Sequence, residues 1–213
     1  VFLGSLALLM NPANAEVQIN GFASIVTGID LNDEQPITST TSDQAYSDRQ
    51  ADQLQESRVG LQVSAKLEDN LRFTGQLVAK GEADGGYTPK YDWAYFDMNI
   101  GSSDKLKIGR VRIPFYKYSD YLDVGYAYHW ITPPKSMYSL SFSNADGISY
   151  LHNNTYAGVD MSFNILYGRY QGILTLGGNP VDGNLENLIT LNWSATFGDH
   201  EVYAAYAQAD VYI

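Results

Sequence analysis

Two neighbouring segments of the chain alternate strictly between apolar and polar residues. In 58–67 apolar residues such as Val59 and Leu61 alternate with polar or small ones, and the pattern restarts in 71–80. Successive side chains of a β-strand point to opposite faces, so each segment predicts a strand with one apolar and one polar face. The three residues between them, 68–70, predict a tight hairpin turn.

Segments of this kind recur along the chain, and we expect about nine strands. They are 17–30, 58–67, 71–80, 91–100, 105–113, 147–152, 156–170, 188–197 and 201–213. The expected short turns are 68–70, 101–104, 153–155 and 198–200, and the long connections are 31–56, 81–90, 114–145 and 172–187. Strands of about ten residues joined alternately by tight turns and long polar loops are typical of transmembrane β-barrels. A soluble β-sandwich has no reason to separate its connections by length in this way. The sequence therefore predicts an all-β fold, an antiparallel transmembrane β-barrel.

The first residues have the features of an export signal. An apolar run, 1–10, is followed by the small-x-small site Ala13-Asn14-Ala15, which predicts a secretory signal peptide over 1–15. The run is too short for a spanning helix, which needs about twenty apolar residues. We therefore expect an exported protein whose barrel domain is 16–213, and a location in the bacterial outer membrane.

Both ends of the chain predict that more sequence belongs to it. The signal lacks an initiator methionine and a charged start, and the last strand pattern, 201–213, stops without a following turn. Bacterial single-chain barrels normally have an even number of strands. We therefore expect this sequence to be the front part of a larger barrel.

Composition narrows the functional classes. The 213 residues carry 24 acidic and 13 basic side chains, a net charge of −11, which argues against a general nucleic-acid binder. There is no cysteine, so neither a disulfide framework nor a thiolate metal site is available. The 17 tyrosines would suit the aromatic girdles that membrane barrels place at their two interfaces.

The basic residues gather on the polar faces of the expected strands. These residues are Arg58, Lys66, Arg72, Lys80 and Lys107. In 105–113 the alternation slips, and a bulge near Gly109 would restore it and turn both Arg110 and Arg112 inward. The aromatic connection 114–145 offers Asp120 and Asp123 as acidic counterparts. The plain alternative is that these charges are merely solvated on a wet face.

The chain resembles the Gram-negative outer-membrane porins of the general diffusion family. The resemblance lies in Lys-Ile-Gly-Arg-Val-Arg-Ile-Pro-Phe (107–115) and in Tyr-Ser-Asp-Tyr-Leu-Asp-Val-Gly-Tyr (118–126). It implies a barrel of about sixteen strands, commonly a homotrimer in outer-membrane lipid, that passes small hydrophilic solutes and ions by diffusion. In that family the third outer loop folds into the lumen as a constriction. The pore-lining and constriction residues expected here are Arg58, Arg72, Lys107, Arg110, Arg112, Asp120 and Asp123.

The sequence also bears on two other functional classes. An enzyme would need a nucleophile beside one of the three histidines, His129, His152 or His200, and no serine stands at a suitable offset on the same face. We therefore expect no catalytic residues, no metal site and no cofactor. A non-conducting barrel that acts as an adhesin or receptor is the remaining alternative, with the acidic loop 31–56 as its working surface and a plugged lumen.

Overall fold

The computed structural model describes residues 16–31, 37–38, 45–46, 51–53, 56–81, 86–121, 123–124, 138, 140, 142–176 and 179–213. The predicted signal peptide, 1–15, and most of the predicted loop 31–56 lie outside the described residues. Within the described part, no helix is both long enough and apolar enough to cross a membrane.

Nine strands form one antiparallel sheet in which each strand is hydrogen-bonded to its neighbour along the chain. They are β1 (Glu16–Ser24), β4 (Arg58–Glu68), β5 (Leu71–Gly81), β6 (Tyr87–Ile100), β7 (Asp104–Arg112), β8 (Asn144–Tyr156), β9 (Val159–Leu176), β10 (Asn179–Phe197) and β11 (His200–Tyr212). A separate small hairpin pairs β2 (Ile37–Thr38) with β3 (Ala45–Tyr46), and a 3-10 turn, η1, covers Ser119–Tyr121. The predicted all-β antiparallel fold is confirmed.

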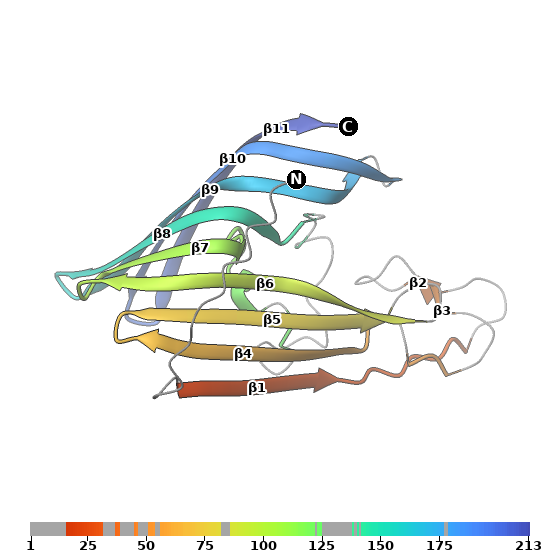
Figure 1. Ribbon diagram of the computed structural model, residues 1–213. Helices are drawn as coiled ribbons and strands as arrows, with labels where there is room; N and C mark the ends of the chain where they lie inside the picture. Colours follow the sequence, from red (N-terminus) through yellow and green to blue (C-terminus); the bar gives the residue numbers. More distant parts are fainter. Residues whose placement is uncertain are drawn as a thin grey trace, which may run out of the picture.

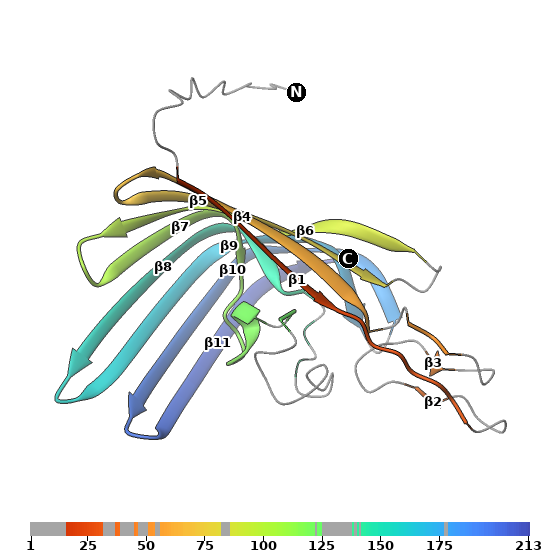
Figure 2. The ribbon, with the colours of Figure 1, turned by 90° about the horizontal axis from the view of Figure 1, so that it is seen from below.

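The sheet is strongly curved but does not close on itself. β1 and β11 are its two edges, so the described strands form an open trough rather than a full cylinder (Figure 1). Figure 2 shows the described start of the connection after β7, which includes η1, inside the curve of this trough. We call the side that holds η1 the inner face and the opposite side the outer face.

The polarity of the two faces is the reverse of that in a soluble protein. Large apolar side chains lie on the outer face, where Leu61 is 48% exposed and Ile108 is 49% exposed. Polar side chains are buried on the inner face, among them Ser64, Thr74 and Asn192. Because the alternation places one set inside and the other outside along every strand, the predicted apolar faces are the outward ones.

The hairpin predicted from the strongest pattern is confirmed in detail. β4 and β5 pair from Arg58 opposite Lys80 to Glu68 opposite Leu71, with the turn at Asp69–Asn70. Ser64 and Thr74 face each other across this pair, their hydroxyl oxygens 3.3 Å apart. The inner face of the pair is therefore held by side-chain hydrogen bonds as well as by the backbone ladder.

Two predicted connections are wrong. The segment 153–155 lies inside β8, and the turn is at Ala157–Gly158, where both residues have positive φ, as tight hairpin turns require. Most of the expected outer loop 172–187 is strand, because β9 and β10 continue as a paired ribbon to their tip. A bulge between Leu185 and Leu188 breaks the apolar alternation there, and this hid the strand from pattern analysis.

The bulge expected near Gly109 is also wrong. β7 pairs with β6 and with β8 without any shift of register, although Gly109 itself has a φ of 136°. The irregularity lies in β6 instead, where Trp93 is opposite Gln76 and Tyr91 is opposite Leu77. This leaves Asp92 as the extra residue, and both Asp92 and Trp93 are buried. The first strand is shorter than predicted, since regular pairing ends at Ser24.

Candidate functional site

The chain that follows β7 returns over the inner face and is held there at two places. The first is a buried ionic cluster around Asp123. Both carboxylate oxygens of Asp123 are bound: Lys80 Nζ lies 2.7 Å and Arg58 Nη1 lies 3.3 Å from Oδ1, and Arg112 Nη2 lies 3.1 Å from Oδ2. The three cations come from β4, β5 and β7, so one loop carboxylate ties three wall strands together.

A second carboxylate completes the cluster. Asp92, at the irregularity in β6, forms an ion pair with Arg112, whose guanidinium also lies 4.9 Å from the centre of the Trp93 ring. The side-chain amide of Asn144 donates a hydrogen bond of 2.9 Å to the Asp92 backbone carbonyl. Arg112 is thus held between two carboxylates and an aromatic face, the setting in which a planar guanidinium is most effective.

The charge state of Asp123 follows from its surroundings. Burial opposes its ionisation, but the nearby Lys80, Arg112 and Arg58 cations outweigh burial and hold the pKa of Asp123 well below its usual range. The carboxylate therefore remains charged throughout the neutral range and binds the loop to the wall.

The second place is at the start of the same loop, on the other side of the trough. The backbone carbonyl of Pro114 accepts hydrogen bonds from the Asn192 side-chain amide on β10 and from the Tyr203 hydroxyl on β11. Three residues later, Lys117 Nζ lies 2.5 Å from Glu201 Oε2. The loop therefore bridges from β10 and β11 to β4 and β5 across the inner face.

An apolar layer supports the loop between these two places. The buried residues Val111, Ile113, Ala145, Leu166 and Leu188 form it, with Tyr95, Phe115, Phe142 and Ala209 packed against it. Ile113 and Phe115 are on the loop side of this layer, directly after β7 ends. The Ile-Pro-Phe sequence that opens the loop thus directs it onto the wall.

A cavity of about 250 Å³ remains between the loop and the wall. Its charged lining residues are Lys107, Arg112, Lys117, Asp120 and Glu201, and its polar ones include Ser149, Asn164 and Asn192. Cationic and acidic groups therefore face the same narrow space, and the remaining lining is mostly polar, with Pro114, Leu151 and Trp193 as its apolar members. Such a space suits water and small hydrophilic solutes.

The structure brings some of the predicted site residues together and separates others. Arg58, Arg112 and Asp123 meet in the ionic cluster. Lys107 lines the 250 Å³ cavity together with Asp120, and its ammonium lies 5.1 Å from the centre of the Tyr95 ring.

Arg72 and Arg110 lie apart from the cluster. Arg72 is exposed near the short turn at 69–70, opposite Asp97 on β6. Arg110 binds Asp146 instead of a loop carboxylate, so the prediction that both β7 arginines share one site is wrong. In the described register, pairing of β7 with β6 ends at Arg110, opposite Ala94, so Arg112 at the end of β7 has no partner on β6 and its guanidinium reaches Asp92 and Asp123.

Several members of the site were missed by pattern analysis. Asp92 and Trp93 fall inside a predicted strand, and no local signal shows that an irregularity turns both inward. Asn192, Tyr203 and Glu201 are about 80 residues from their loop partners, with separations of 78, 89 and 84. The sequence did contain one signal, the proline and aromatic residues at the start of the loop. They predicted that the loop packs against the protein, but not which strands it contacts.

No family model and no curated protein sequence matches the chain. Solved structures with a similar arrangement include three of Vibrio cholerae OmpT. A loop L8 deletion mutant has 13% identity over 92% of this chain and 70% of its own, with a TM-score of 0.39. Outer-membrane expressed OmpT has 13% identity over 92% and 64%, with a TM-score of 0.38. In-vitro folded OmpT, described as a trimer form, has 11% identity over 92% and 66%, with a TM-score of 0.37.

Proposed function

We propose that this chain forms part of the wall and the constriction loop of an outer-membrane porin. In this proposal the curved sheet surrounds a water-filled channel, and the loop after β7 narrows it. Partners for β1 and β11 close the barrel. The channel passes small hydrophilic solutes and ions by passive diffusion, and no bond is made or broken.

The observation that carries the proposal is the reversed polarity of the sheet. Exposing apolar surface to water costs about 25 cal/mol per Å². A row of exposed residues such as Leu61, Ile108 and Ile148, each close to 50% exposed, would therefore be unfavourable in water and is favourable in lipid. The polar inner face has the opposite preference, so the same strands that meet lipid outside meet water inside.

The residues around the loop suggest how such a channel would select solutes. Lys107 and Arg112 line the 250 Å³ cavity from the wall, and Asp120 lines it from the loop. A narrow aqueous opening between opposed charges excludes large or apolar solutes and biases ions by sign. The buried cluster at Asp123 would keep the loop in place, so that the opening has a fixed size.

We further propose that the protein is exported by the predicted signal peptide, 1–15, to the outer membrane of a Gram-negative bacterium, and that it assembles as a homotrimer. The outward apolar faces support the membrane location. The resemblance to general diffusion porins supports the trimer.

One observation favours the second candidate, a non-conducting barrel that serves as an adhesin or receptor. Such a barrel fills its interior with paired charges, and Arg58, Lys80, Arg112, Asp92 and Asp123 form a dense paired group. A second ion pair, Lys117–Glu201, lies elsewhere on the inner face and borders the 250 Å³ cavity. Lys107 and Asp120 still border open space, which favours the channel.

Swelling of liposomes separates the two candidates. The full-length protein is reconstituted into vesicles that are then placed in isotonic solutions of uncharged sugars of increasing size. A porin gives swelling rates that fall steeply as the sugar becomes larger. A folded, inserted protein that produces no swelling with any sugar would refute the porin proposal and favour the adhesin or receptor.

A further inference from the structure

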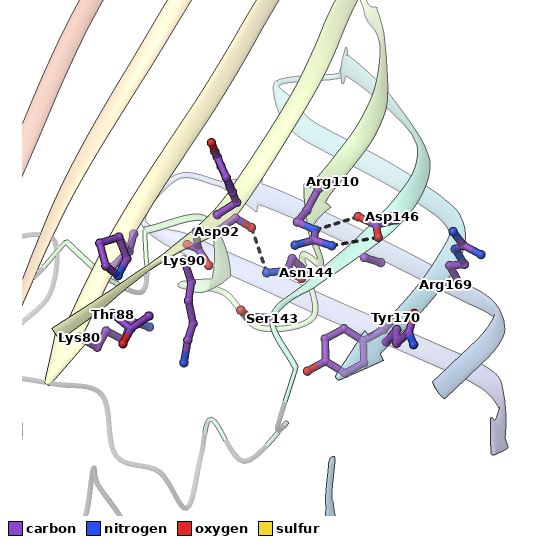
Figure 3. Close-up of a pocket in the computed structure, with 15 residues that line it drawn as sticks. Lys80, Thr88, Lys90, Asp92, Arg110, Ser143, Asn144, Asp146, Arg169 and Tyr170 are labelled. Carbon is purple, nitrogen blue, oxygen red and sulfur yellow. Dashed lines mark hydrogen bonds and ion pairs between the residues drawn. The ribbon is translucent and has the colours of Figure 1, made fainter. Parts of the chain in front are cut away.

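The sheet has a notch where the loop leaves the wall. β7 ends at Arg112 and β8 begins at Asn144, whereas β6 and β9 continue further on either side. In the described register, residues 87–93 of β6 have no partner on β7, and residues 170–176 of β9 have none on β8. A cavity of about 480 Å³ lies at this notch (Figure 3).

The lining of the notch has an excess of positive charge. Its charged residues are Lys80, Lys90, Arg110, Arg169, Asp92 and Asp146, four cations against two carboxylates. Arg110 holds Asp146 with both arms of its fork, Nε to Oδ1 at 2.8 Å and Nη2 to Oδ2 at 3.0 Å. Arg110 on β7, Asp146 on β8 and Arg169 on β9 are paired in register and form a row across the three strands. With two cations and one carboxylate, this row carries one surplus positive charge.

This row belongs to the outer face. Ile108, Ile148 and Tyr167 are 49%, 48% and 55% exposed on that face. Arg110, Asp146 and Arg169 each lie two residues further along the same strands, and alternate residues of a strand share a face. Lys80, which also lines the notch, reaches Asp123 on the inner side. The notch therefore extends from the outer surface into the wall.

Aromatic residues indicate the depth of the notch in the membrane. Tyr87 and Tyr91, on the extended part of β6, are 47% and 64% exposed, and Tyr91 itself lines the notch. Amphipathic rings on the outside of a barrel mark the interface between hydrocarbon and headgroups. The surplus cation at Arg169 thus lies where lipid headgroups are, on the side of the long connections. A lipid-facing arginine at this level is stable when a headgroup anion pairs with it.

We propose that this notch binds a phosphate group of an outer-leaflet lipid. Arg169 contacts the phosphate, and the Arg110–Asp146 pair forms the fixed floor of the site. A guanidinium matches phosphate oxygens in a bidentate manner, and such charge-assisted pairs are the stronger class of hydrogen bonds. The inference rests on the membrane insertion in the proposed function, but not on whether the channel conducts.

Native mass spectrometry of the full-length protein tests the site directly. Detergent micelles containing lipopolysaccharide are used, and the bound lipid is counted for the wild type, Arg169→Gln and a control, Lys66→Gln. Lys66 pairs with Asp69 beside the short turn at 69–70, so its loss removes the same charge far from the notch. We expect Arg169→Gln to bind the lipid about tenfold more weakly than the wild type, because one charge-assisted pair is lost. Lys66→Gln should retain the lipid as the wild type does. Removal of the phosphates from the lipid should abolish the difference.

Three results would overturn the inference. The first is equal retention of lipid by the two variants. The second is displacement of the lipid by inorganic phosphate, which would make a soluble anion the ligand. The third is a change of oligomeric state in Arg169→Gln with unchanged lipid retention, which would assign the notch to a second copy of the chain. Liposome swelling of the same samples keeps the two proposals separate, because selective lipid binding by a non-conducting protein refutes the porin and leaves the notch site standing.

Discussion

Two arginines only two residues apart on β7 illustrate how differently one strand can use the same side chain. The side chain of Arg112 is 5% exposed and lies between Asp92 and Asp123 inside the trough. The side chain of Arg110 is 41% exposed and holds a single carboxylate, Asp146, at the notch. The first anchors the loop to the wall, and the second lies on the outer surface.

Burial, rather than the number of ion pairs, decides how much these charges contribute to the free energy of unfolding. Removing one partner of a buried ionic group leaves an uncompensated charge and typically costs about 3–5 kcal/mol. An exposed pair is screened by solvent and contributes about 0–1 kcal/mol. Arg110 and Asp146 have good geometry, but each side chain is more than 40% exposed, so the lower value applies.

The largest expected effect is at Asp123. In Asp123→Asn the Arg58, Lys80 and Arg112 cations lose their shared carboxylate, and we expect the free energy of unfolding to fall by about 3–5 kcal/mol. Asp146→Asn is the matched control and should cost less than about 1 kcal/mol. Equilibrium unfolding in urea, with the protein in lipid vesicles, measures both. Equal losses for the two variants would remove the distinction between the buried and the exposed arginine.

Acid should weaken the same cluster without mutation. Because the pKa of Asp123 is lowered in the folded protein, its contribution is fully present above the usual aspartate pKa of about 4 and is lost as the pH falls through the lowered value. We expect the loop to become sensitive to an acid-active protease only well below pH 4. In Asp123→Asn the loop should already be sensitive at neutral pH. A wild-type loop that opens near neutral pH would contradict this charge state.

A smaller effect is expected at Gly109, which immediately precedes Arg110. Its φ of 136° is unfavourable for residues with a side chain, and an added Cβ would lie 2.4 Å from the Ala94 carbonyl oxygen. Gly109→Ala should therefore destabilise the protein by about 1–3 kcal/mol through backbone strain. Gly158→Ala, at a positive φ with open space around it, is the control for strain without a clash. Urea unfolding that ranks Gly158→Ala above Gly109→Ala would show that the close approach to β6 is unimportant.

The smallest effect is expected at the exposed end of the loop. Lys117 pairs with Glu201, but the lysine side chain is 52% exposed, so Lys117→Gln should lower the free energy of unfolding by less than about 1 kcal/mol. The Pro114 carbonyl remains bound by Asn192 and Tyr203 in this variant. A loss as large as that of Asp123→Asn in the same unfolding experiment would place the main anchor of the loop on β11 instead.

The sequence predicts those parts of the fold that depend on local periodicity. The strict alternation of 58–67 and 71–80 and the turn between them correspond closely to β4, β5 and their hairpin. Alternation fails in 172–187, where the bulge between Leu185 and Leu188 shifts the phase of the strand. Asn153 and Asn154 favour turns locally, yet pairing with β9 keeps them in a strand.

The candidate site is less accessible from sequence because its members meet through tertiary contacts. Alternation placed Arg58 on an inner face, and its position placed Asp123 on the following loop. Arg112 was predicted to point inward only because a bulge was expected near Gly109, and β7 has no such shift. That Asp92 joins them depends on an irregularity in β6 that no residue pattern marks. Arg110 was misplaced because the slip of the apolar alternation in 105–113 indicated a bulge. The strand in fact keeps its register.

Single-channel conductance shows whether the polar inner face encloses an open aqueous path. The full-length protein is inserted into a planar bilayer, and the reversal potential is measured across a salt gradient for the wild type and Arg112→Gln. We expect large ohmic steps, and a shift of the Arg112→Gln reversal potential toward cation preference, because a wall cation has been removed. A protein that inserts in folded form but carries no current would show that the inner face encloses no open path.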